Sequence, residues 1–65
     1  MTGTELIEWR ETMGWTQEHA AKTLGYSRRA YIDLEQSEKP LRDVIGFACA
    51  AIAAGMAPWA PNSGQ

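Results

Sequence analysis

The sequence predicts a small all-α domain, a compact bundle of four to five helices with a central helix-turn-helix. Three observations support this fold class. Threonine and serine residues with helix-capping spacing precede apolar residues that recur three and four positions apart. Glycines follow the ends of these segments, and no alternating strand pattern, hairpin signal or repeat is present. The 65 residues have room for one domain, which we assign to 1–58, followed by a short tail at 59–65.

The first helix is expected to begin at Thr2 or Thr4 and to end at Gly14. Thr2 and Glu5 have the spacing of a capping box, in which each side chain bonds the other residue's backbone N–H. The inward stripe of this helix consists of Leu6, Ile7, Trp9 and Met13.

Two short helices are expected next, separated by a glycine turn. Thr16 is the predicted N-cap of the second helix, and Gly25 its left-handed stop. Ser27 is the predicted N-cap of the third helix, which we expect to end near Gln36 and Ser37. The inward positions of the pair are Ala20, Ala21, Leu24, Ala30, Tyr31 and Leu34.

The fourth helix is expected from about Leu41 to Ala54, with Pro40 in its first turn and Gly55 at its stop. Every residue between Val44 and Ala54 except Gly46 is hydrophobic. A helix that is apolar all round is buried on every side or paired with another chain, and a chain this short has little material to bury it. We therefore expect a two-fold interface between copies, with the anchors Phe47, Ile52, Met56 and Trp59. The competing interpretation, compatible with the first on another face, completes the monomer core with Val44, Ile45, Ala48 and Ile52.

Composition excludes several classes of protein. One cysteine and one histidine supply neither an internal disulfide nor a four-ligand zinc site, and we expect no metal and no small-molecule cofactor. No apolar run approaches the length of a transmembrane helix, and the N-terminus lacks the features of a signal peptide. We therefore expect a cytoplasmic protein with no membrane partner and with a reduced Cys49. Polar residues are too few and scattered to form a catalytic constellation, so we do not expect an enzyme.

Charge is unevenly distributed along the chain, although the net charge is only −2. Residues 4–14 carry three glutamates against one arginine, whereas residues 16–32 carry three basic residues against one glutamate. A local positive field of this kind can attract a polyanion even when the whole chain is acidic.

The segment from Thr16 to Glu35 has the pattern of a helix-turn-helix, which uses its second helix to probe the DNA major groove. It resembles the phage repressor/Cro-type (XRE-like) family, and the resemblance extends over residues 4–54 and implies a lambda-repressor-like fold. The matching positions are Thr16-Gln17-Glu18, Ala21, Leu24-Gly25, Ser27-Arg28 and Leu34-Glu35. The chain departs from the family pattern at Ser37, where a glycine is common, and at Tyr31, where a smaller aliphatic residue is usual.

The outward face of the third helix contains the candidate base contacts. Arg28 and Arg29 lie in its first turn, where cations oppose the helix dipole, and a guanidinium can donate two parallel hydrogen bonds to guanine. The alternative for this pair is a solubilising role. Ile32 is expected either to contact a thymine methyl group or to pack against the fourth helix. Asp33 is expected either to accept from cytosine N4 or to hold Arg29 four residues back.

Backbone contacts would fix the register of the protein on DNA. The resemblance implies that Gln17 reaches a phosphate at the start of the second helix. The full set of candidate phosphate contacts is Thr16, Gln17, Ser27, Gln36, Ser37, Lys39 and Arg42. The resemblance also implies a partly buried structural ion pair between Arg10 and Glu35, which would orient the third helix.

These features predict a homodimeric, sequence-specific transcriptional regulator that binds an inverted repeat in double-stranded DNA, with half-sites about 34 Å apart. Family analogy suggests repression of its own promoter. The settings compatible with the resemblance are phage lysis–lysogeny regulators, antitoxins and the short repressors associated with anti-CRISPR genes. The alternative is an antitoxin or protein-interaction module with the same fold and little DNA specificity.

Overall fold

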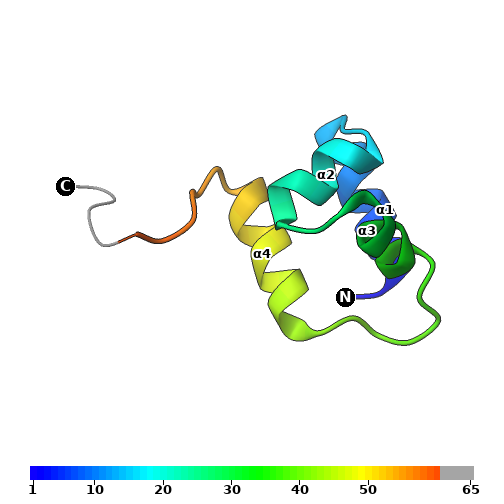
Figure 1. Cartoon of the computed structure of the whole chain (residues 1–65). Helices are drawn as coiled ribbons and strands as arrows, with labels where there is room; N and C mark the ends of the chain where they lie inside the picture. The colour runs from blue at the N-terminus through cyan, green and yellow to red at the C-terminus, as the bar shows by residue number, and fades with distance from the viewer. Residues whose placement is uncertain (61–65) are drawn as a thin grey trace.

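Four helices make up the folded part of the chain in the computed structural model, which describes residues 1–60 (Figure 1). They are α1 (Gly3–Met13), α2 (Gln17–Leu24), α3 (Arg28–Glu35) and α4 (Asp43–Ala53). The prediction of an all-helical fold is confirmed, because no strand occurs among these residues. None of the helices within residues 1–60 has the length and apolar character that a membrane crossing requires.

The caps of α1 lie where the sequence predicts them. The Thr2 side chain accepts a hydrogen bond from the Glu5 backbone N–H at 3.1 Å, and the Glu5 carboxylate accepts from the Thr2 N–H at 2.8 Å. Gly14 ends the helix with φ of 74°, a left-handed conformation that costs glycine little. The helix therefore begins from Thr2 and not from Thr4.

The short helices α2 and α3 are capped in the same way. Thr16 accepts from the His19 N–H and Ser27 accepts from the Ala30 N–H, each at 3.1 Å. Between them Gly25 takes φ of 83° and ends α2. The chain therefore reverses between α2 and α3 within three residues.

The start of α4 differs from the prediction. Pro40 does not lie in its first turn, because the helix begins at Asp43 and the preceding residues are extended or in a loop. The reason is tertiary: the Leu41 side chain is buried in the core, and its N–H donates to the Met1 carbonyl at 2.8 Å. This bond holds Leu41 against the N-terminus, and α4 begins two residues later than predicted.

The core lies where the four helices meet. Tyr31 of α3 and Leu6 of α1 are its largest fully buried side chains. The other buried apolar residues are Ala20, Ala21, Leu41, Ile45 and Cys49. Trp9 closes one side of the core, where its Nε1–H donates to the Cys49 carbonyl at 3.1 Å and ties α1 to α4.

The first residue of α1 packs directly on the end of α3. A Cβ atom at Gly3 would lie 2.5 Å from the Glu35 carbonyl oxygen and 2.9 Å from that of Leu34. Both obstacles are backbone atoms, so the absence of a side chain at Gly3 permits the close approach of the two helices.

The chain leaves the helices after α4. Gly55 adopts φ of 79°, and residues 56–60 run away from the four helices (Figure 1). The predicted tail at 59–65 is described only in its first two residues, and residues 61–65 lie outside the described part of the chain.

Candidate nucleic-acid interface

The turn between α2 and α3 fixes the direction in which α3 leaves. The Tyr26 N–H donates to the Ala21 carbonyl at 2.8 Å, and the left-handed Gly25 donates to the Lys22 carbonyl at 3.1 Å. Ser27 then caps α3, so that Arg28 and Arg29 are its first two residues.

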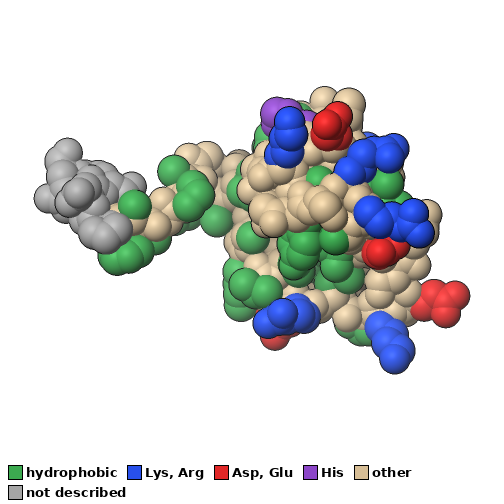
Figure 2. Space-filling model, in the orientation of Figure 1, with side chains coloured by type: hydrophobic (Ala, Val, Ile, Leu, Met, Phe, Trp, Pro, Cys, Tyr) green, Lys and Arg blue, Asp and Glu red, His purple; other side chains and the backbone are tan. Residues whose placement is uncertain are grey.

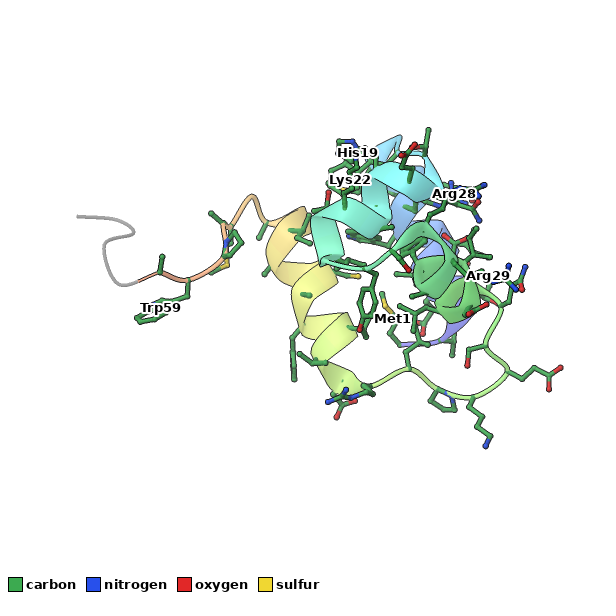
Figure 3. All side chains as sticks on the ribbon, viewed as in Figure 1. Met1, His19, Lys22, Arg28, Arg29 and Trp59 are labelled. Atoms are coloured by element: carbon green, nitrogen blue, oxygen red, sulfur yellow. The ribbon has the colours of Figure 1, made fainter. Side chains whose placement is uncertain are left out.

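One face of α3 forms a shallow surface hollow. Its lining consists of the four candidate base contacts Arg28, Arg29, Ile32 and Asp33, together with the candidate phosphate contact Gln36. The side chain of Arg29 is 89% exposed, and Arg28 is also exposed. Figure 3 shows Arg28 and Arg29 projecting from the same side of the molecule. We call this set of five residues the α3 face.

The charges of the α3 face are largely uncompensated. The Arg29 Nε lies 3.9 Å from the Asp33 Oδ1, a loose pair between two exposed side chains that contributes little energy. No carboxylate within residues 1–60 lies within salt-bridge distance of Arg28. Ile32 is half-buried in the hollow between these polar groups. The face therefore offers two guanidinium groups beside an apolar side chain.

The hydroxyl groups predicted to contact phosphates differ in whether their proton is free to donate. Thr16 and Ser27 are exposed and use their oxygens as acceptors in the helix caps, so each hydroxyl proton is free to donate to an anion. Ser37 instead donates its proton to the Lys39 carbonyl at 2.9 Å. A phosphate contact from Ser37 would have to break this local bond.

The remaining basic candidates lie after α3. Lys39 is exposed in the loop, and Arg42 is exposed at the N-cap of α4. Within residues 1–60 neither of them has a carboxylate partner at salt-bridge distance. Gln36, at the C-cap of α3, is exposed and belongs to the α3 face.

A polar network supports α3 from beneath. The Arg10 Nε–H donates to the Glu35 Oε2 at 2.7 Å, and the Gln17 Nε2 donates to the Glu35 Oε1 at 2.9 Å. Arg10 also donates from Nη1 to the Trp15 carbonyl at 3.1 Å. Glu35 thereby receives hydrogen bonds from α1 and α2 at once. The structure contains the Arg10–Glu35 ion pair, with side chains 18% and 3% exposed.

Sequence reasoning missed the bond between Gln17 and Glu35. The resemblance implied a phosphate contact for Gln17, whereas the structure binds one of its amide N–H groups to the Glu35 carboxylate. The amide has a second N–H, which leaves one donor for an anion. No sequence signal indicates this bond, because it depends on the distance between α2 and the end of α3.

Burial and hydrogen bonding oppose each other at Glu35. Burial alone would raise the pKa of the Glu35 carboxyl, but the hydrogen bonds from Arg10 and Gln17 and the charge of Arg10 lower it below its ordinary value. Burial, together with the nearby carboxylate, raises the pKa of the Tyr31 phenol. The site therefore contains a carboxylate that stays ionised although it is buried.

No protein-family model, curated protein or solved structure matches this chain. The candidate site is therefore defined by its own geometry. Within residues 1–60 no group of three or more histidine, cysteine, aspartate or glutamate side chains is arranged to hold a metal ion.

The predicted dimer anchors fall into two groups. Phe47, Met56 and Trp59 are largely exposed, and Trp59 has the highest exposure at 85%. Ile52 is half-buried and lines an apolar groove together with Met56. Of the residues assigned to the monomer core in the alternative, Ile45 is buried and Val44 is exposed.

Proposed function

We propose that this protein is a homodimeric, sequence-specific DNA-binding regulator of transcription that inserts α3 into the major groove. The observation that carries the proposal is the α3 face, where Arg28 and Arg29 lie exposed in the first turn of a helix that follows a tight turn. In a helix-turn-helix protein this end of the second helix approaches the base edges.

The chemistry of the α3 face suits direct contact with bases. A guanidinium donates two parallel hydrogen bonds to the O6 and N7 atoms of guanine, an arrangement that a solvated lysine does not reproduce. Arg28 has no competing carboxylate among the described residues, and the pair between Arg29 and Asp33 is loose enough to open. Ile32 lies on the same face and suits contact with a thymine methyl group.

Groups around the α3 face suit the DNA backbone. Thr16, Ser27 and Gln17 each retain a proton to donate, and Lys39 and Arg42 add exposed cations. These contacts fix register and do not discriminate between sequences. The Glu35 network supports the same function, because it holds α3 in a fixed orientation relative to α1 and α2. Repression follows when the bound dimer occludes a promoter.

Selection from a pool of random duplexes tests the proposal. The expected product is an inverted repeat whose half-sites lie about 34 Å apart centre to centre, and footprinting of it should show two symmetric protected segments. The alternative, a protein-interaction module of the same fold, is expected to enrich no sequence. Folded wild-type protein that enriches no duplex at low salt would reject the proposal.

A further inference from the structure

We infer that two copies of this chain exchange their Trp59 side chains, each seated in a groove on the other copy. This inference specifies how the dimer in the proposed function is built. It requires a groove, a segment that cannot fill its own groove, and enough area for a stable dimer.

The groove lies between α2 and the end of α4. Its cavity volume is about 320 Å³, and its lining includes Leu24, Ala48, Ala51, Ile52, Met56 and Pro58. No charged side chain of residues 1–60 lines it. A group that enters this groove therefore has to be large and apolar, since a charged group would lose its hydration without gaining a partner.

Trp59 is the matching group on the same chain. It is 85% exposed, and Figure 3 shows it on the segment that runs away from the four helices. An exposed indole is a large apolar surface for a domain of this size, and tryptophan is among the residues that most often dominate interfaces. We call residues 56–60 the C-terminal arm.

The arm is poorly placed to fill the groove of its own chain. Met56, Ala57 and Pro58 already line the groove of their own chain, so Trp59 is the first residue of the arm that is not part of this lining. Pro58 fixes its own φ and restricts Ala57 to extended conformations, which carry the next residue onward along the arm. Figure 1 shows the arm leaving the helices in this direction. A second copy related by two-fold symmetry accepts the arm, and its own arm returns the contact.

The exposed face of α4 continues into the groove. Phe47 is 73% exposed, and Ala51, one turn further along, is part of the groove lining. A stable dimer buries about 800 Å² on each partner, whereas a single aromatic side chain buries about 150–250 Å². Phe47 alone therefore supplies too little area. The addition of the arm and the groove brings the interface toward the required size.

The test uses one arm variant and one groove variant. Trp59→Ala removes the indole, and Thr23→Glu places a carboxylate at the groove, where Thr23 is an exposed lining residue of α2. Thr12→Glu is the matched control, because Thr12 is also exposed and is also the penultimate residue of its helix. Circular dichroism checks that each variant is folded.

Sedimentation equilibrium without DNA measures the dimer dissociation constant of each variant. We expect Trp59→Ala and Thr23→Glu each to weaken the dimer by at least about 30-fold, the size of an interface hot spot, while Thr12→Glu leaves it unchanged. An equimolar mixture of Trp59→Ala and Thr23→Glu should associate more tightly than either variant alone. Only the mixed dimer contains an intact pair, formed by the indole of one chain and the groove of the other.

Three results would overturn the exchange. They are a monomeric wild type, a Trp59→Ala dimer with an unchanged dissociation constant, and a mixture that associates no more tightly than the single variants. The last result is what packing of the arm within one chain predicts. These outcomes are separate from those of the DNA selection. Wild-type protein that selects an inverted repeat while the mixture gains nothing leaves the proposed function standing. If the mixture recovers association while the wild-type protein enriches no duplex, the exchange stands and the proposed function is rejected.

Discussion

Glu35 is the residue on which the orientation of α3 depends most. Its carboxylate is 3% exposed and accepts hydrogen bonds from Arg10 of α1 and Gln17 of α2. A buried ion pair adds little net stability compared with apolar packing, but the loss of one partner leaves the other buried without compensation. The network therefore acts as a positioning device for the helix that we propose to contact DNA.

The pH dependence of stability provides a test of this network. The pKa of Glu35 is lower in the folded protein than its ordinary value of 4.5, so the unfolded chain binds this proton first as the pH falls. The stabilisation is present above about pH 4.5 and is lost as the pH falls through the folded pKa. We expect Glu35→Gln to lower the free energy of unfolding at pH 7 by about 2 kcal/mol and to flatten its decline in acid.

Urea denaturation from pH 7 to pH 3 measures both effects. Glu11→Gln is the control, because Glu11 is an exposed glutamate on α1 with no salt bridge in residues 1–60. The described role of the network is contradicted if the free energy of unfolding of Glu35→Gln and that of Glu11→Gln depend on pH in the same way from pH 7 to pH 3.

At the scale of elements, the sequence predicted helix starts better than helix packing. Thr2, Thr16 and Ser27 are caps in the structure because capping is local and depends on residues three positions apart. Pro40 was assigned wrongly because the backbone bond from Leu41 to Met1 joins residues distant in sequence. The close approach of Gly3 to the backbone at the end of α3 was not predicted for the same reason.

The packing of α1 on α3 is tested by a pair of glycine substitutions. Gly3→Ala places a Cβ 2.5 Å from a backbone oxygen of Glu35, so the helices must separate. We expect a loss of about 1–3 kcal/mol, equivalent to a fall in Tm of about 4–8 °C for each kcal/mol. In Gly46→Ala the new Cβ meets only the Met1 Cβ, at 3.6 Å. This control should gain about 0.5–1 kcal/mol, because alanine is the better helix former.

Thermal denaturation followed by circular dichroism at 222 nm distinguishes the two glycine variants. Equal changes in Tm for Gly3→Ala and Gly46→Ala would contradict the described contact between α1 and α3.

The candidate site shows the same limit of sequence reasoning. Periodicity alone placed Arg28, Arg29 and Ile32 on one face, since these residues share a helix and its repeat is known. The bond of Gln17 to Glu35 could not be predicted, because it depends on the distance between α2 and the end of α3. The bond of Ser37 to Lys39 is local and of a kind that serine commonly makes in turns, but it was not predicted.

At the scale of the whole molecule, basic and acidic side chains are mixed on the face that carries α3. The net charge is −2, and Figure 2 shows lysine and arginine side chains, with acidic side chains among them, on the side of the molecule that carries Arg28 and Arg29. Three of the eight acidic residues are the exposed glutamates of α1. Association with DNA is therefore expected to depend on local charge, and strongly on salt.

The salt dependence of binding tests the role of the loop. The logarithm of the association constant falls with the logarithm of salt concentration, with a slope of about −0.9 for each phosphate neutralised. Lys39→Ala removes one cation from each protomer and should reduce the magnitude of the slope by about 2 in the dimer. Lys22→Ala is the control, because Lys22 is an exposed cation of α2 outside the proposed contacts. Equal slopes for wild type and Lys39→Ala would remove Lys39 from the interface.

Base recognition by α3 is tested most directly by a double-mutant cycle on the selected duplex. One arm of the cycle is Arg28→Ala, and the other replaces a half-site guanine with 7-deazaguanine, which lacks the N7 acceptor. We expect each single change to weaken binding by about 1–3 kcal/mol. At one guanine in each half-site, the 7-deaza change should weaken the binding of Arg28→Ala little further, because the side chain that contacts N7 is already absent. Two results would contradict the account. In the first, 7-deazaguanine weakens binding of Arg28→Ala as much as it weakens binding of the wild type, at every guanine tested. In the second, 7-deazaguanine does not weaken binding of the wild type at any guanine.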